Sequence, residues 1–226
     1  MAAVIVAIDG PAGVGKSTTS RRVAEALELP HIDTGAMYRA MALKAVRRAI
    51  DLRDESVLQS LAASTSIDLE GSGAAQKVIL DGEDVTGSIR TPEMSMAASL
   101  VSAVPAVRRV LVRMQQEMGR RAGGVLEGRD IGTKVFPETP YKFFLTARPE
   151  VRARRRQLEL EARGISQDVS LVLGEIETRD RQDSERHDSP LRWDDTYHVV
   201  DTSDLSIRQV VGLIVDRVRS GNASAP

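Results

Sequence analysis

The sequence predicts an α/β protein in which helices flank a parallel sheet. Residues 3–8 form a continuous β-branched apolar run, which is typical of a strand buried on both faces. A glycine-rich turn and a helical pattern follow this run directly, and strand and helix candidates alternate along the rest of the chain. A length of 226 residues favours one core with appendages over two large domains.

The first half of the chain contains two strand–helix units and one segment of different character. Apolar residues recur with helical spacing from Gly15 to Glu28, after the first strand. Leu29 to Asp33 is the second strand candidate, and Ala36 to Ile50 has the apolar stripe of a helix. Between Ser64 and Pro105, short alternating stretches are separated by glycine turns, which predicts a small antiparallel insert.

The second half completes a set of five strands and adds further helices. The pattern predicts buried strands at 125–126, 141–145 and 197–200, and helices at 107–118, over most of 149–192 with breaks at Gly164 and Pro190, and at 205–218.

The composition excludes several classes of function. Lys+Arg 31 against Asp+Glu 32 gives a net charge of -1, so no global basic field attracts nucleic acid or an anionic membrane. The absence of cysteine excludes disulfides, a thiol nucleophile and cysteine-based metal sites. The longest apolar run, Met1 to Ile8, is far shorter than the ~20 residues of a membrane span. We expect a soluble cytoplasmic monomer with neither nucleic-acid nor membrane partners.

Gly10 to Ser17 satisfy the pattern G-x-x-x-x-G-K-[ST] of a phosphate-binding loop (P-loop). The glycines of such a loop let backbone N–H groups surround a polyphosphate at a helix N-terminus. Lys16 adds a positive charge beside the β- and γ-phosphates, and the Ser17 hydroxyl can bind Mg²⁺. A glycine turn without a ligand is the plainer alternative, which the flanking strand and helix disfavour. The expected ATP-binding residues are Gly10, Pro11, Ala12, Gly13, Val14, Gly15, Lys16, Ser17 and Thr18.

A P-loop alone does not identify a reaction, because GTPases, motors and small-molecule kinases all contain one. Asp68-Leu69-Glu70-Gly71 matches the D-x-x-G pattern of GTPases, but it lies in the expected insert. The guanine-binding pattern Asn-Lys-x-Asp is impossible, since the only asparagine is Asn222. We therefore interpret Asp68 to Gly71 as part of a hairpin.

Six segments occur along the chain in this order: GPAGVGKST, DTGAMYR, SIRT, EGRDIGTKVFP, FFLTA and TRDRQDSER. This ordered set resembles the bacterial cytidylate (CMP) kinases, and the resemblance extends from about Val4 to Val218. Two departures preserve the chemical type: Glu127 stands where the family commonly has Asp, and Thr34 where it commonly has Ser.

The resemblance implies a P-loop kinase fold, transfer of the γ-phosphoryl group of ATP to CMP or dCMP, and Mg²⁺ bound with ATP. It also implies the acceptor site. Arg39, Arg129 and Arg186 hold the acceptor phosphate, Arg179 and Asp183 the sugar hydroxyls, and Ser99, Arg108 and Asp130 the base, while Thr34 and Tyr38 join the site through the DTGAMYR segment.

The chemistry of cytosine agrees in kind with this set. Cytosine offers an amino donor beside two acceptors, so a carboxylate or hydroxyl together with an arginine suits it. Uracil presents an oxygen where cytosine has the amino group, and a carboxylate at that point repels it.

The arginine-rich stretch near residues 148–156 has two interpretations. Arg152 and Arg156 stand four apart on one helical face, so their guanidiniums can converge on a phosphate. Alternatively, glutamates downstream balance the charges of a solvated face. Isolated charges at Arg39 and Arg129 likewise have a solvated or locally paired alternative. The order of the motifs favours function, with Lys16, Arg129, Arg152 and Arg156 as the catalytic residues.

Water must be kept from the transferred group, which is the physical reason to expect mobile covers over a compact core. We divide the chain accordingly. The core comprises 1–61, 101–149 and 166–219, the acceptor-binding insert 62–100, the lid 150–165, and a disordered tail 220–226.

Other functions stay open at this point. A different P-loop kinase, acting on UMP, AMP, thymidylate or shikimate, would share the first motif and the lid. The insert and the base-binding residues count against this alternative. A nucleotide-switched binding protein needs ordered switch loops. The histidines His31, His187 and His198 lack metal-ligand spacing, and we expect packing or surface roles for them.

Overall fold

The computed structural model describes residues 3–71 and 73–223. Five parallel strands form one sheet in the order β2-β6-β1-β7-β8. The strands are β1 (Ile5–Asp9), β2 (His31–Asp33), β6 (Gly124–Gly128), β7 (Tyr141–Thr146) and β8 (His198–Asp201). The α/β class and the five-stranded parallel sheet predicted from the sequence are therefore confirmed.

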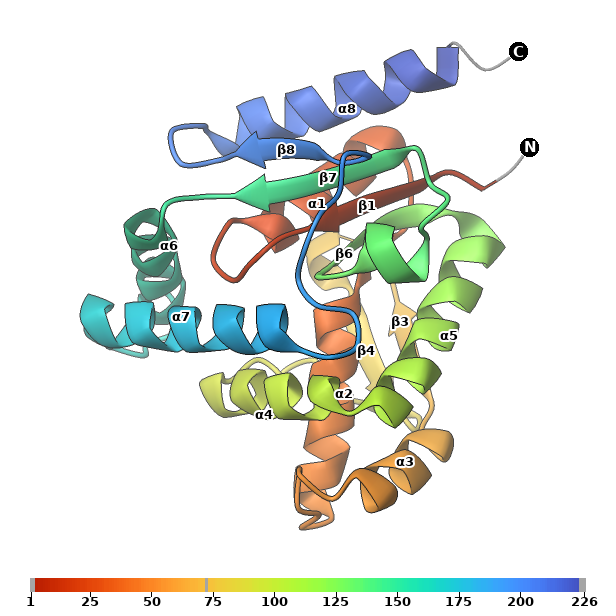
Figure 1. Cartoon of the computed structure of the whole chain (residues 1–226), viewed down its shortest axis with the longest axis vertical. Helices are drawn as coiled ribbons and strands as arrows, with labels where there is room; N and C mark the ends of the chain where they lie inside the picture. The colour runs from red at the N-terminus through yellow and green to blue at the C-terminus, as the bar shows by residue number, and fades with distance from the viewer. Residues whose placement is uncertain (1–2, 72, 224–226) are drawn as a thin grey trace.

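Strand β1 is apolar from Ile5 to Ile8 because both of its faces are buried (Figure 1). Val6 and Ile8 pack into the cluster formed with α1 (Lys16–Leu27) and α8 (Ile207–Ala223). Ile5 and Ala7 face the opposite cluster, which includes residues of the π-helical turn η2 (Ile131–Val135) and of α5 (Pro105–Ala122).

The insert contains the three-stranded antiparallel sheet that the glycine turns predict. Its strands are β3 (Ile67–Glu70), β4 (Lys77–Leu80) and β5 (Glu83–Asp84), with the short 3-10 turn η1 (Gly73–Ala75) between the first two. Asp68 lies in β3, and Gly71 follows that strand with a φ of 76°, consistent with a hairpin.

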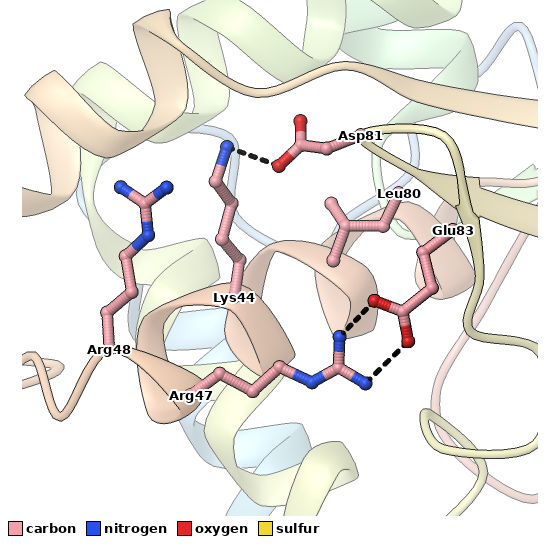
Figure 2. A pocket seen from close by; sticks show the side chains of 6 residues that line it. All are labelled: Lys44, Arg47, Arg48, Leu80, Asp81 and Glu83. Atoms are coloured by element: carbon pink, nitrogen blue, oxygen red, sulfur yellow. Dashed lines mark hydrogen bonds and ion pairs between the residues drawn. The ribbon is translucent and has the colours of Figure 1, made fainter.

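Ion pairs tie the insert to helix α2 (Thr34–Arg47) of the core. Figure 2 shows Lys44 beside Asp81, at 2.6 Å, and Arg47 beside Glu83, at 2.6 Å. The buried Lys44 ammonium also donates to the carbonyl oxygen of Ser64 at 2.8 Å. These contacts join the insert to helix α2.

Two helices at the borders of the insert were not predicted. They are α3 (Glu55–Ala63) and α4 (Pro92–Ala103), and α4 packs against α2. The Thr91 side chain caps α4 by accepting from the N–H of Met94 at 3.2 Å, with Pro92 at the first helical position. Thr91 and Pro92 thus formed a start signal that the sequence interpretation overlooked.

The chain end also departs from the prediction. Helix α8 extends to Ala223, so the prediction of a disordered tail is wrong for residues 220–223, and residues 224–226 lie outside the described part. A side chain at Gly221 would come within 2.8 Å of the Tyr141 ring, so glycine allows α8 to lie close to β7 there.

Helices α6 (Pro149–Glu161) and α7 (Val169–Glu185) lie beyond the carboxyl ends of β1 and β7 (Figure 1). They share a small apolar core with Ala12 of the P-loop, formed by Ala153, Leu160, Val172 and Ile176. The arginine-rich region is therefore packed directly on the loop expected to bind ATP. Among the described helices none is by itself long and apolar enough to span a bilayer; α4 and α5 satisfy that test only jointly, across a 102° bend.

Candidate active site

The P-loop joins β1 to α1 in a conformation that requires glycine. Gly13 and Gly15 have φ values of 77° and 93°, and a side chain at Gly10 would overlap the carbonyl oxygen of Leu145. Gly15 is the N-cap of α1 and provides no side-chain cap. The first N–H groups of α1 are thus left for an anion.

Lys16 is buried at the start of α1 and bends back over the loop. Its ammonium donates to the carbonyl oxygen of Pro11 at 2.6 Å. Burial, followed by the positive charge of Arg129, lowers the pKa of Lys16 to about 7. A bound polyphosphate would raise that pKa again, because it supplies the negative charge that the free site lacks.

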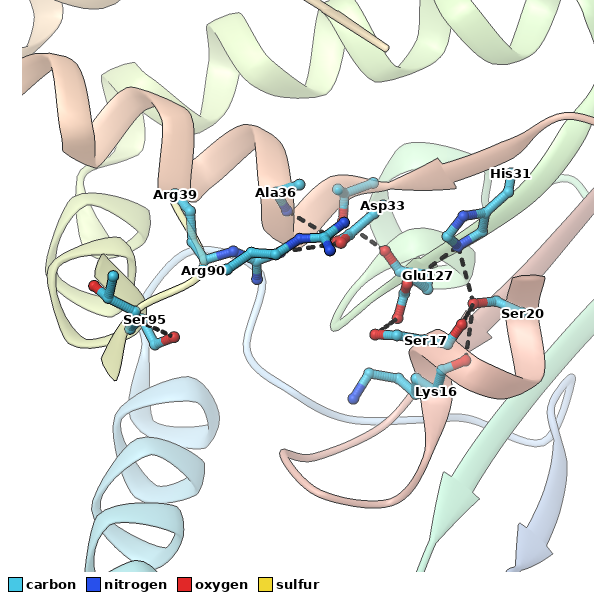
Figure 3. A network of polar contacts seen from close by, with 12 residues as sticks. Lys16, Ser17, Ser20, His31, Asp33, Ala36, Arg39, Arg90, Ser95 and Glu127 are labelled. Carbon is cyan, nitrogen blue, oxygen red and sulfur yellow. Dashed lines mark hydrogen bonds and ion pairs between the residues drawn. The ribbon is translucent and has the colours of Figure 1, made fainter. Parts of the chain in front are cut away.

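Beside the loop, Ser17 is linked to a buried carboxylate and a buried histidine (Figure 3). Its hydroxyl donates to Oε2 of Glu127 at 2.8 Å. Oε1 of Glu127 lies 3.1 Å from His31 Nε2, which is also 3.1 Å from the hydroxyl of Ser20. Burial alone would lower the pKa of His31, but the hydrogen bond and charge of Glu127 raise it.

The Ser17 hydroxyl and the Glu127 carboxylate fit the donor set that Mg²⁺ prefers. Mg²⁺ takes hard oxygen ligands and usually binds through one or two protein side chains together with substrate phosphates. No group of three or more His, Cys, Asp or Glu residues in the described chain could hold a metal by itself. These residues therefore suit a metal that arrives with a nucleotide. Thr34 fixes the same segment by donating to the Glu127 carbonyl at 2.6 Å.

A cluster of arginines from three elements faces the P-loop lysine. Arg179, on α7, has a buried Nε without a hydrogen-bond partner. Burial, and then the charge of Arg129, lowers the pKa of Arg179 to about 10, with Arg156 and Arg39 acting in the same direction. Arg129, Arg39 and Arg156 each pair with a carboxylate, whereas Arg179 makes no ion pair among the described residues, so an anion is favoured beside Arg179.

Two carboxylates orient arginines at the edge of this cluster. Asp183 accepts from Arg129 Nε at 2.8 Å and lies 3.5 Å from Arg186. Burial would raise the pKa of Asp183, but Arg129 and Arg186 hold it below its usual value. Asp33 caps α2 and pairs with Arg39 at 3.0 Å. The spacing of Asp183 and Arg186 along the chain thus does place them together.

The residues expected to bind the base are paired with one another or with neighbours. Arg108 and Asp130 form a buried ion pair, and the Arg108 guanidinium lies 5.7 Å from the ring centroid of Tyr38. Burial raises the pKa of Tyr38 to about 12. The Ser99 hydroxyl donates to Gln182 Oε1 of α7 at 2.8 Å.

The turn that holds Arg129 and Asp130 is fixed by a buried carboxylate at the end of β1. Asp9 accepts from the N–H groups of Ile131 and Gly132, both at 2.9 Å, and from the Tyr197 hydroxyl at 2.8 Å. Burial raises the pKa of Asp9 to about 6. Asp9 therefore couples the position of this turn to the start of the P-loop.

Arg152 and Arg156, in the segment expected to form the lid, contact different partners. Arg152 pairs with Asp180 and donates to the Ala12 carbonyl at 3.3 Å, while Asp180 also accepts from the Ala12 N–H at 3.1 Å. Arg156 pairs with Glu159 at 2.8 Å. The spacing suggested two guanidiniums meeting at one phosphate, but in this structure Arg152 clamps the P-loop and Arg156 stays on its own helix.

Comparison with known proteins decides the family. A family model described as cytidylate kinase matches residues 6–220. The chain belongs to the cytidylate kinase family. It is 50% identical over 217 residues to a cytidylate kinase of Pelotomaculum thermopropionicum, covering 96% of each chain. A cytidylate kinase of Syntrophotalea carbinolica is 49% identical over 208 residues, which cover 92% of this chain and 88% of the relative.

A solved structure shares the fold. An uncharacterized protein from Eubacterium ventriosum aligns with a TM-score of 0.55 at 13% identity, covering 96% of this chain and 98% of that chain. The resemblance drawn from the six ordered segments is confirmed by the family match.

Sequence reasoning missed several groups in this member of the cytidylate kinase family. Glu127 was noted only as a departure from Asp, and His31 only as a packing or surface residue. Glu127 accepts from Ser17, and His31 lies 3.1 Å from Glu127. Asp180 and Gln182 lie in the TRDRQDSER segment, where the expected Arg179 and Asp183 drew attention away from them. Residues two apart on a helix point to different sides, so helical spacing gave no signal for this pair.

Proposed function

We propose that the protein transfers the γ-phosphoryl group of ATP to CMP or dCMP, giving CDP or dCDP. The observation that supports this most directly is the arginine cluster within electrostatic reach of Lys16, in which Arg179 Nε is buried without a partner. In a member of the cytidylate kinase family, such a cluster fits an acceptor phosphate lying opposite ATP.

The proposed mechanism uses position and charge and needs no general base. A nucleoside monophosphate already bears most of two negative charges at neutral pH, so its oxygen is nucleophilic without proton removal. Arg39, Arg129 and Arg186 orient the acceptor phosphate, and Lys16 neutralises charge that develops on the transferred group. Arg152 and Arg156 of the lid spread the charge that develops on the transferred group.

Mg²⁺ bound with ATP would supply positive charge that offsets the negative charge of the phosphates. Ser17 would hold the metal, and Glu127 would orient Ser17 by accepting from its hydroxyl. Both residues already stand at hydrogen-bond distance from each other.

At the base, we propose that cytosine replaces existing contacts. Its amino group donates to Asp130, and its carbonyl oxygen accepts from Arg108. Ser99 exchanges its bond to Gln182 for one to the base. Arg179 and Asp183 bind the sugar hydroxyls, while Thr34 and Tyr38 line the acceptor side.

The insert at 62–100 and the lid at 150–165 are proposed as covers that exclude water. Arg163 donates to the Arg90 carbonyl at 3.2 Å, a contact between these two regions. With CMP and a non-hydrolysable ATP analogue together, hydrogen exchange in both regions should slow by roughly tenfold or more, because covers are drawn from the least stable part of a fold. Unchanged exchange in both regions contradicts the division into covers and core.

A coupled assay of ADP release tests the reaction itself. The purified protein is mixed with ATP, Mg²⁺ and, in turn, CMP, dCMP, UMP, AMP, dTMP or shikimate. CMP and dCMP should give the highest kcat/KM by at least about tenfold. A preference for AMP or shikimate supports the alternative kinases, and slow turnover with every acceptor supports a nucleotide-switched binding protein. We further propose that the protein acts as a monomer in the cytoplasm. Light scattering tests the oligomeric state, and cell fractionation tests the location.

A further inference from the structure

His31, on β2, takes no part in the mechanism above, yet it is held in place from two sides. Its carbonyl oxygen accepts from the Gln76 side chain at 2.7 Å. Its Nε2 lies 3.1 Å from Glu127 Oε1 and 3.1 Å from Ser20 Oγ, and the ring is only 8% exposed (Figure 3). Among the described residues, no lysine or arginine lies within hydrogen-bond distance of the Glu127 carboxylate, and His31 is its one basic neighbour.

The surrounding hydrogen bonds assign the proton on this ring. The Ser20 hydroxyl donates to the Lys16 carbonyl at 2.8 Å, so its proton is already used. The Glu127 carboxylate can only accept. Both neighbours of His31 Nε2 are therefore acceptors, and Nε2–H is the donor to them.

Glu127 is thus held at both of its oxygens. Oε2 accepts from Ser17, and Oε1 accepts from His31. A glutamate has one more rotatable bond than the aspartate commonly found at this position of the family, so a second fixed point restricts where its carboxylate lies. Residues that hydrogen-bond to the ligands of a metal, without touching the metal, orient those ligands.

We propose that His31 is a positioning residue, which holds the Glu127 carboxylate against the Ser17 hydroxyl and so orients Ser17 toward the Mg²⁺ brought by the nucleotide. This inference rests on the proposed function. It predicts that the loss of the His31 donor weakens the effect of Mg²⁺ on nucleotide binding and leaves metal-free binding unchanged.

Calorimetric titration with ADP, in Mg²⁺ and in EDTA, measures this effect without turnover. The quantity of interest is the ratio of the Kd in EDTA to the Kd in Mg²⁺. His31→Phe keeps a ring but has no donor, and it should lower this ratio about tenfold while the Kd in EDTA changes less than about twofold. His31→Gln places an amide N–H near the position of Nε2 and should restore most of the ratio.

Two controls separate positioning from packing. His198→Gln makes the same substitution at a histidine outside the site, which contacts Arg217 at 3.0 Å, and should leave the ratio unchanged. Glu127→Asp shortens the carboxylate so that it no longer spans Ser17 and His31. Adding His31→Phe to Glu127→Asp should then cause no further loss, since the two changes act through one contact.

The outcomes distinguish a failure of the role assigned to His31 from a failure of the proposed kinase function. A parent protein that shows no Mg²⁺-dependent gain, or no CMP phosphorylation, overturns the proposed function. A parent with both, alongside a His31→Phe variant that keeps the full ratio, overturns only the role of His31. Equal losses in His31→Phe and His31→Gln also overturn it, because they indicate packing. Thermal unfolding checks that each variant folds; if His31→Phe does not, His31→Asn replaces it, since its shorter amide does not reach Glu127.

Discussion

The proposed phosphate-binding end and the proposed base-binding end of the site differ in how their charges are paired. We refer to them as the phosphate end and the base end. At the phosphate end, Lys16 and Arg179 both have lowered pKa values, first because they are buried and then because Arg129 lies near them. At the base end, Arg108 is neutralised by Asp130, and Ser99 is bonded to Gln182. Lys16 and Arg179 make no ion pair among the described residues, whereas Arg108 and Ser99 each have a protein partner.

This difference separates binding strength from selectivity. An anion entering the phosphate end gains from positive potential that exists before it arrives. A base entering the other end must replace bonds that the protein already makes, so its net gain is small. A wrong base leaves a buried polar group without a partner, and that loss is large. We expect charge removal to affect every substrate alike, and changes at the base end to alter their ranking.

Removal of the P-loop charge should have the largest effect. Lys16→Ala takes away a cation that neutralises the transferred group, so kcat should fall by at least about a hundredfold for CMP and UMP equally. Lys16→Met, which retains the aliphatic stem, is the matched variant and should fall as far. The unfolding midpoint should stay within about 4 °C, since the lost charge was desolvated. Turnover within tenfold of the parent removes this loop from the mechanism.

Substitution at the base end should instead change selectivity. Asp130→Asn exchanges an acceptor for an amide that can turn its NH₂ group toward uracil O4. The kcat/KM for CMP should fall by ~1.5 to 3 kcal/mol, roughly ten- to a hundredfold, while that for UMP falls less or rises. The CMP/UMP ratio is the measured quantity. If Asp130 serves only to orient Arg108, with which it is paired, both substrates lose equally and the ratio stays constant.

The fold could be predicted where burial alone sets the pattern. Strands β1, β6 and β7 lie inside the sheet, and each contains consecutive buried apolar residues, at 5–8, 125–126 and 143–145. Helix α4 escaped prediction because its buried positions are small residues such as Ala97 and Ala98, whose contrast with polar neighbours is weak. The end of α8 escaped because Gly221 resembles a tail residue until the Tyr141 ring is seen beside it.

The site could be predicted only as a set of residue types. Local motifs placed Lys16 and Ser17, since a P-loop is formed by consecutive residues. Partners distant in sequence could not be found: Ser99 meets Gln182 across 83 positions, and Ser17 meets Glu127 across 110. The pairing of Arg129 with Asp183, across 54 positions, could not be found from local motifs either.

A smaller shift in the same direction is expected at Ser99. Its hydroxyl makes a neutral hydrogen bond, which is weaker than the charge-assisted bond of Asp130. Ser99→Ala should therefore lower the CMP/UMP ratio by about fivefold. Gln182→Ala removes the partner of Ser99 in the free protein and leaves its hydroxyl available to the base, so it should not lower the ratio. A larger fall for Ser99→Ala than for Asp130→Asn reverses the assigned order of the two contacts.

The lowered pKa of Lys16 at the phosphate end should also be visible as proton uptake when a nucleotide binds. With a pKa of about 7, Lys16 is largely neutral at pH 8 in the free protein, and a bound polyphosphate raises its pKa. Binding therefore takes up protons, and affinity falls as pH rises: ADP measured in EDTA should bind about fivefold more weakly at pH 8 than at pH 7. Calorimetry in buffers of different ionisation enthalpy counts the protons directly. Lys16→Arg keeps the charge on a group that does not titrate, so both the uptake and the extra pH dependence should disappear. If they persist in Lys16→Arg, the titrating group is the nucleotide and not the protein, and the phosphate end holds its full charge before ligand arrives.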